Sequence, residues 1–232
     1  TLGIDTSTLM ATCALIDENK VLGEYSLNQD MSHSEKLIPM VKETLDSLDL
    51  EPKDIDLYGV SVGPGSFTGL RIGVATIKAL AHLFNKPVVG VSTLEALAYN
   101  LAHNDIIVPM IDARRDRVYT AIYSWENEGL KEILEPSIYE IRDFLDLLGK
   151  YDSLVVNGDG VIIHKDIIRE TLGDRVGFAS LGQNSTRAAS IAELARKKYS
   201  QGQRDDYFSL APDYLRPSQA ERELNLKKEE PR

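Results

Sequence analysis

The order of predicted strands and helices constrains the fold of this sequence more than any other feature. Hydrophobic alternation and helical periodicity predict three strands, a helix, a strand, a helix, a strand and a helix within residues 1–104. The same order starts again at residue 106, although no residue pattern aligns between the two passes. Such alternation indicates the α/β class. The predicted strands are 1–5, 10–16, 20–27, 55–62, 88–91, 106–111, 117–125, 130–139, 153–157 and 175–178, and the predicted helices are 33–48, 66–84, 92–101, 139–149, 160–172 and 185–200.

Two successive passes of this kind resemble the duplicated actin-like architecture shared by sugar kinases, heat-shock 70 proteins and actin (ASKHA). We therefore predict an N-terminal lobe over residues 1–104 and a C-terminal lobe over residues 105–217, which includes a closing helix. Residues 218–232 form a highly charged tail without an apolar stripe. We expect this tail to be frayed or to be ordered by a partner.

The composition narrows the class of protein. The 232 residues are 43% hydrophobic and 27% charged, as in ordinary soluble domains, and no run approaches the length of a membrane span. The single cysteine, Cys13, excludes an internal disulfide, and no signal peptide is recognisable, so we expect a cytoplasmic protein. A net charge of −10 argues against nonspecific binding of nucleic acid by this chain alone.

The helix predicted at 66–84 carries more apolar surface than one packed face needs. A continuous stripe at spacings of three and four should face the chain's own sheet. Gly65, Gly69 and Gly73 follow another face at intervals of four, although each glycine inside a helix costs up to about 1 kcal/mol relative to alanine. Close approach of a helix from another protein would explain them; burial of both faces within this chain is the alternative. The stripe consists of Phe67, Leu70, Val74, Ile77, Ala81 and Phe84, and the second surface continues through Ile72, Thr76, Ala79 and Leu83.

A nucleotide site is only half present in the sequence. The glycine segment at 63–73 is neither a Walker A loop nor a dinucleotide-binding fingerprint. Asp5, Thr6 and Ser7 follow the first strand, where actin-like folds place groups that contact metal and phosphate; an ordinary turn would use the same residues. The matching loop at 112–117 lacks a glycine-rich turn, and the segment 157–160 either borders an adenosine pocket or is a plain turn. We predict no cofactor, with ATP or ADP binding weak or absent.

No catalytic or metal-binding set can be assembled from spacing. The four histidines show no metal-ligand pattern, and no serine–histidine–aspartate set is evident. We therefore predict no catalytic residues and no metal site. An active actin-like ATPase or small-molecule kinase remains the rival interpretation, favoured by Asp5 and the fold, whereas a peptidase is disfavoured by the missing motifs.

Several motifs together resemble the bacterial TsaB (YeaZ) family, from the first residues to about residue 216. The family resemblance implies a role in forming threonylcarbamoyladenosine in tRNA, as the non-catalytic paralogue of the threonylcarbamoyltransferase TsaD, working with the ATPase TsaE. Thr93 and Leu97 stand where the resemblance places the two metal-binding histidines of TsaD, and neither side chain can replace an imidazole on a transition metal. The motifs are Ile4-Asp-Thr-Ser7, Gly63-Pro-Gly-Ser-Phe-Thr-Gly-Leu-Arg-Ile-Gly73, Gly90-Val-Ser-Thr-Leu94, Ile111-Asp-Ala-Arg-Arg115 with Tyr119, and Tyr214-Leu-Arg216.

The resemblance also implies partners. The helices at 33–48 and 66–84 would form a helical bundle with TsaD, and in isolation the same helices could pair two copies of this chain. Contact with tRNA is expected only within the complex, and no membrane partner is expected. The candidate partner-binding residues are Met40, Gly69, Ile72, Gly73, Thr76 and Leu83.

Overall fold

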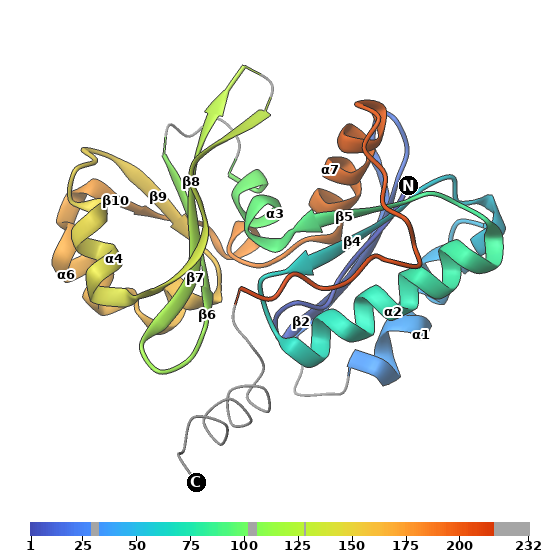
Figure 1. The fold of residues 1–232 in the computed structure, drawn as a ribbon, viewed down its shortest axis with the longest axis horizontal. Coiled ribbons are helices and arrows are strands. Elements are labelled where there is room, and N and C mark those ends of the chain that lie inside the picture. The colour runs from blue at the N-terminus through green and yellow to red at the C-terminus, as the bar shows by residue number, and fades with distance from the viewer. Residues whose placement is uncertain (29–32, 102–105, 128, 216–232) are drawn as a thin grey trace, which may run out of the picture.

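Two five-stranded mixed sheets, one from each half of the chain, organise the fold (Figure 1). The computed structural model describes residues 1–28, 33–101, 106–127 and 129–215. The strand orders, β3-β2-β1-β4-β5 and β8-β7-β6-β9-β10, correspond position by position. In each sheet the first three strands pair antiparallel and the remaining two add in parallel. The predicted duplicated α/β architecture is therefore confirmed.

The helices and strands occur in the predicted order, with bounds close to the predicted ones. The first pass contains β1 (Leu2–Asp5), β2 (Met10–Ile16), β3 (Val21–Asn28), α1 (His33–Asp46), β4 (Tyr58–Gly63), α2 (Phe67–Phe84), β5 (Val88–Ser92) and α3 (Thr93–Tyr99). The second contains β6 (Ile107–Asp112), β7 (Arg117–Glu126), β8 (Gly129–Glu140), α4 (Ile141–Leu148), β9 (Leu154–Asn157), α5 (Asp159–Ile163), α6 (Lys165–Leu172), β10 (Val176–Phe178) and α7 (Ala188–Ser200). The single helix predicted at 160–172 is in fact two, because the backbone leaves the helical region at His164.

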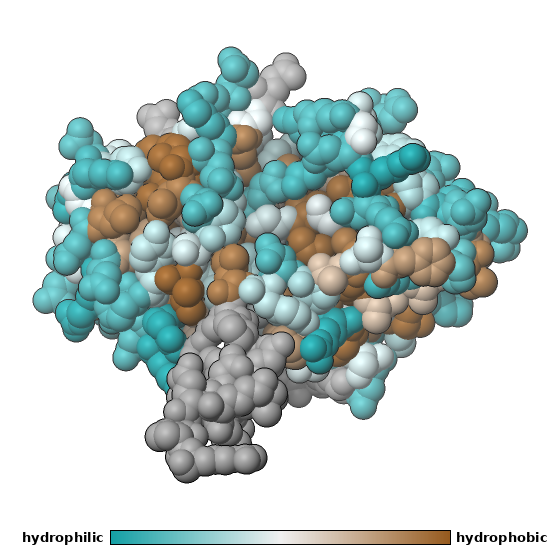
Figure 2. Space-filling view, in the orientation of Figure 1, coloured by the Kyte–Doolittle hydropathy of each residue, from teal (hydrophilic) through white to brown (hydrophobic). Residues whose placement is uncertain are grey.

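The sheets and helices stack in five layers. Helices α1 and α2 cover one face of the first sheet and share its main core with Leu2, Ile4 and Val60. Helices α4 and α6 cover the outer face of the second sheet. Helix α3 lies between the lobes and joins both cores, through Leu97 on the second sheet and Ala96 beside α7. Figure 2 shows hydrophilic side chains over most of the periphery, with hydrophobic ones visible mainly towards the middle of each lobe.

Helix α7 corrects the predicted domain assignment. The sequence placed this closing helix in the C-terminal lobe, but it packs on the first sheet, beside α3 (Figure 1). The physical reason is close approach between small residues: a Cβ added to Gly3 would lie 2.4 Å from the carbonyl oxygen of Ala188, and one added to Gly59 would lie 2.8 Å from the Cβ of Ala195. The predicted boundary at 104/105 and the predicted tail at 218–232 lie outside the described residues.

Helix α2 corrects the statement that no segment could span a membrane. It is 18 residues long and apolar enough to qualify by length and composition alone. One side of it is nevertheless buried in the first lobe, as the stripe predicted. Val74, Ile77 and Ala81 pack in the core of that lobe, and Leu70 is fully buried. Full burial of a valine, leucine or isoleucine side chain contributes about 1.5–3 kcal/mol to the stability of the fold.

Candidate functional site

A cleft of about 1180 Å³ separates the two lobes. The first lobe lines it with the β1–β2 loop and the start of α2, and the second lobe with the β6–β7 loop and the start of α5. Residues 184–186, which lead into α7, also line it. This is the place where the sequence predicted the remains of a nucleotide site, so its polar groups decide what the cleft can bind.

The three first-lobe residues predicted for a nucleotide site are buried and already bonded within the chain. Asp5, Thr6 and Ser7 are at most 1% exposed. Asp5 Oδ1 accepts hydrogen bonds from the backbone N–H and the hydroxyl of Ser7, both at 2.8 Å. The Thr6 hydroxyl donates to the carbonyl oxygen of Gly69 in α2, also at 2.8 Å. These groups therefore hold the loop against α2 instead of presenting it to a ligand.

Burial also sets the ionisation of Asp5. Desolvation raises the pKa of the Asp5 carboxyl, while the hydrogen bonds from Ser7 act in the opposite direction. A carboxyl that is fully buried, with its charged form disfavoured by desolvation, is a poor ligand for a divalent cation. The residues at this position therefore do not fit the metal–phosphate site that the fold family implies.

The same loop explains why glycine is required at three positions in and just before α2. This corrects the predicted reason for these glycines. A Cβ on Gly69 would lie 1.9 Å from the carbonyl oxygen of Thr6, and one on Gly73 would lie 2.5 Å from the Thr6 hydroxyl. Gly65 stands in the same relation to Ser7, at 2.4 Å from its carbonyl oxygen. The approaching chain is thus the protein's own β1–β2 loop, not a helix from a partner.

The second-lobe loop is built differently. Asp159, at the start of α5, accepts a hydrogen bond at 3.0 Å from the backbone N–H of Asp112. The backbone N–H of Asp112 is therefore engaged by this carboxylate and is not available to an anion. Burial raises the pKa of Asp159, and the neighbouring charge of Asp112 raises it further. Arg114 and Arg115 at the tip are exposed, and they and Asp116 adopt left-handed backbone angles. Two further amides of the loop are engaged within it: that of Ala113 donates to the carbonyl oxygen of Arg117, and that of Arg114 donates to the carboxylate of Asp112.

The positions matched to the metal-binding histidines hold buried side chains. Thr93 and Leu97 lie at 0% and 1% exposure in the first turns of α3, between the two lobes. Within the residues that the structure describes, no three histidine, cysteine, aspartate or glutamate side chains gather closely enough to hold a metal ion. These positions act in interlobe packing.

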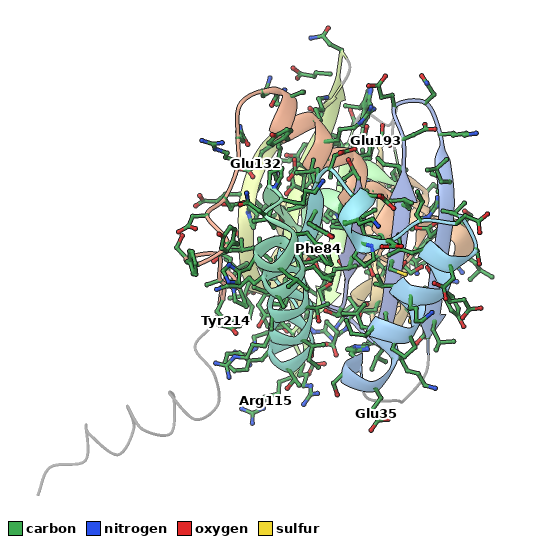
Figure 3. All side chains as sticks on the ribbon, turned by 90° about the vertical axis from the view of Figure 1, so that its right-hand side faces the viewer. Glu35, Phe84, Arg115, Glu132, Glu193 and Tyr214 are labelled. Carbon is green, nitrogen blue, oxygen red and sulfur yellow. The ribbon has the colours of Figure 1, made fainter. Side chains whose placement is uncertain are left out.

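One outward strip of α2 carries no charged side chain, and the exposed Arg71 lies beside it. In helical projection Thr68, Ile72, Ala75, Thr76, Ala79 and Leu83 form one strip, and Leu83 is 73% exposed. Ile38 of the adjoining α1 is 51% exposed. Of the candidate partner-binding residues, Ile72, Thr76 and Leu83 reach this surface, whereas Met40, Gly69 and Gly73 are buried within the chain. Figure 3 shows α1 and α2 side by side on this face.

A C-terminal strap, residues 203–215, runs along the other flank of α2. The Tyr214 ring stacks on Phe67 at a centroid distance of 4.3 Å, and its hydroxyl accepts a hydrogen bond from Arg71. Lys78 donates to the carbonyl oxygens of Phe208 and Leu210. Sequence reasoning assigned no role to this strap; the signal was the aromatic residues of the segment 207–214, which are unusual in an otherwise polar C-terminal region. Figure 3 shows Tyr214 beside α2.

The architecture and the altered cleft define a class, a two-lobed actin-like protein. YeaZ from Pseudomonas aeruginosa superposes with a TM-score of 0.76 at 24% identity, covering 92% of this chain and 98% of that one. The activator of the 2-hydroxyisocaproyl-CoA dehydratase from Clostridium difficile superposes with a TM-score of 0.54 at 8% identity, covering 89% and 98%.

The sequence comparisons then identify the family. The family model described as "TsaD: tRNA N6-adenosine threonylcarbamoyltransferase" matches residues 20–224. The "tRNA threonylcarbamoyladenosine biosynthesis protein TsaB" of Bacillus subtilis (strain 168) is 36% identical over 222 residues, which is 95% of each chain. The chain belongs to the TsaB (YeaZ) family, and the predicted resemblance is confirmed.

Proposed function

We propose that this chain is a non-catalytic subunit in tRNA threonylcarbamoyladenosine biosynthesis, which docks on the threonylcarbamoyltransferase TsaD and activates it. The carrying observation is the uncharged outer strip of α2 with Leu83 at 73% exposure. In a chain with 27% charged residues, an outward helix strip without charge is typical of a surface that binds another protein.

The contact surface consists of the outer strip of α2 together with Ile38 of α1. These helices lie side by side, so they can add two members to a bundle completed by two helices of the partner. Gly69, Gly73 and Met40 support this surface from beneath, because their own atoms are covered by the chain. We further propose that two copies pair through the same strip when TsaD is absent, and that TsaE and tRNA join only through the complex.

The test compares tRNA modification by TsaD and TsaE with and without this chain. Leu83→Glu places a charge in the strip, whereas Leu181→Glu makes the same change between β10 and α7, away from the strip, at a position that is 93% exposed. We expect Leu83→Glu to weaken association with TsaD at least about tenfold, or 1.4 kcal/mol, and to slow modification, with Leu181→Glu unchanged. A full rate without this chain, or equal binding of both variants, would contradict the proposal.

We also propose that ATP or ADP binds this chain weakly at most. The support is that Asp5 Oδ1, the Thr6 hydroxyl and the Asp112 amide are hydrogen-bonded within the chain, and that Asp5 is fully buried. The rival function, an active actin-like ATPase or small-molecule kinase, requires these groups to be released. Isothermal titration with ATP, ADP and magnesium separates the two, because a dissociation constant below about 1 μM would favour the rival.

A further inference from the structure

The chain passes between the lobes twice, and residues of both passages line the cleft. The first passage is α3 together with Asn100 and Leu101, which follow it. The second is the connector, residues 179–187, between β10 and α7. Two-lobed proteins that close on ligands do so by changing backbone angles at a few residues in such passages. The contacts of the connector therefore show how freely the lobes can turn.

From the second lobe, the end of β9 grips both passages. Asn157 is fully buried, and its side-chain N–H₂ donates to the carbonyl oxygen of Leu97 in α3 at 2.8 Å and to that of Gln183 in the connector at 2.9 Å. The next backbone N–H, of Gly158, donates to the side-chain oxygen of Asn184 at 3.1 Å. The second lobe is thus hydrogen-bonded to both of the passages about which it would have to turn.

From the first lobe, Asn100 makes the matching set of bonds. Its side-chain N–H₂ donates to the carbonyl oxygen of Ser185 at 2.9 Å, and its side-chain oxygen accepts from the hydroxyl of Ser190 in α7 at 2.7 Å. The side-chain N–H₂ of Gln183 donates back to the carbonyl oxygen of Asn100 at 3.2 Å. The two passages are therefore joined directly to each other.

Apolar packing reinforces these bonds. Leu94, Leu97 and Ala98 of α3 share a buried cluster with Ile107 and Ile111 of the second sheet. On its other side, α3 contributes Ala96 to the cluster that holds α7 on the first sheet. Turning one lobe against the other would break the hydrogen bonds of these side-chain amides. It would also separate α3 from one of the two sheets on which it packs, and both changes are unfavourable.

We propose that the hinge of this protein is clamped, so that the two lobes move as one rigid body and the cleft keeps a fixed opening. Asn157 and Asn100 are the positioning residues of this clamp. The proposal does not depend on the docking function, because it concerns the isolated chain. Unlike the cleft of an ATPase that closes on its ligand, this cleft would not close. The surface of the first lobe would therefore keep one orientation relative to the second lobe.

The test is an interlobe distance distribution measured by pulsed electron spin resonance. Spin labels are attached at Glu43→Cys in α1 and Glu170→Cys in α6, both exposed positions, while the fully buried Cys13 is kept. The labelled chain is diluted with an excess of unlabelled chain, so that distances between two copies do not contribute. We expect one narrow distribution that millimolar Mg-ATP does not shift. Asn157→Ala should at least double its width, and Gln183→Ala, a change at an exposed side chain, should broaden it less.

Thr120→Val is the matched control, because it removes a buried hydroxyl that donates to the carbonyl oxygen of Pro109 entirely within the second lobe. It should lower thermal stability without broadening the distribution, which separates clamping from general destabilisation. A broad or two-peaked distribution in the parent, or a shift on adding Mg-ATP, overturns the proposal. The proposal is also overturned if Gln183→Ala leaves the width unchanged and Asn157→Ala either leaves it unchanged or fails to fold.

Discussion

The loops that follow the first strand of each lobe occupy equivalent places in the repeated topology, yet they are built in opposite ways. The first-lobe loop, residues 5–8, is sealed against α2, with Thr6 hydrogen-bonded to Gly69. The second-lobe loop, residues 112–117, projects exposed arginines with left-handed backbone angles, and one of the hydrogen bonds that hold it comes from Asp159. The difference teaches that one half of a duplicated cleft has become packing, while the other half has kept a surface loop.

Gly69→Ala tests the sealed loop most severely. The new Cβ would lie 1.9 Å from the Thr6 carbonyl oxygen, and backbone cannot move aside as a flexible side chain can. We expect a loss of about 3 kcal/mol or more in the free energy of unfolding, measured by urea denaturation. Gly182→Ala, where a Cβ meets no atom within 4 Å, should stay within about 0.5 kcal/mol. Similar stabilities for the two variants would mean that the loop is not packed as described.

Thr6→Val isolates the hydrogen bond from the steric fit. Valine keeps the shape but leaves the Gly69 carbonyl oxygen buried without the hydroxyl that now lies 2.8 Å away. We expect a loss of about 2 kcal/mol in the same denaturation experiment. Thr8→Val at the half-buried end of the loop is the comparison, and its loss should be below about 1 kcal/mol. Equal losses would assign the effect to the loop as a whole.

Asp5→Asn should change how stability depends on pH. Because burial raises the folded-state pKa of Asp5, the stability that neutral Asp5 contributes is complete below its ordinary value of 3.8 and is lost as the pH rises through the raised value. Asparagine cannot ionise, so the variant should gain on the parent as the pH rises, by less than Thr6→Val loses. Thermal unfolding from pH 4 to pH 8 measures this trend.

Asp17→Asn provides the opposite sign in the same experiment. Backbone hydrogen bonds from Asn19 and Lys20 lower the pKa of this exposed carboxyl. The stability it contributes is therefore present above the ordinary pKa and lost as the pH falls, so the parent should lead at neutral pH and the two should converge in acid. If Asp5→Asn followed this same course, the assignment of Asp5 as a desolvated carboxyl would be wrong.

Arg115→Gly should have the smallest effect, in keeping with an exposed second-lobe loop. Arg115 has a φ of 57°, where glycine avoids the steric cost that other residues carry. Part of this gain is offset by the larger backbone freedom of glycine in the unfolded chain, so stability should rise by up to about 1 kcal/mol. Arg169→Gly, inside α6, should instead lose about 1 kcal/mol. A loss at position 115 would show that its side chain stabilises the loop.

Much of the fold followed from local pattern. The alternation of strands and helices predicted the order of elements along the chain and its repetition, and the apolar stripe of α2 predicted its buried side through Val74, Ile77 and Ala81. The candidate site was predicted less well. Ile72, Thr76 and Leu83 do lie towards the surface, but Met40 is buried with Leu37 on the inner side of α1. An apolar residue in a helix does not by itself reveal whether its own chain or a partner covers it.

The sequence by itself determined the duplicated α/β order, the two strips of α2 and the family, since each depends on residue types at short, regular spacing. Only the tertiary structure decided which element meets each strip. The glycines of α2 proved to fit Thr6, some sixty residues earlier, and α7 proved to rest on the first sheet through Gly3 and Gly59. Close approach between distant segments depends on backbone positions in space, and spacing along the chain does not encode them.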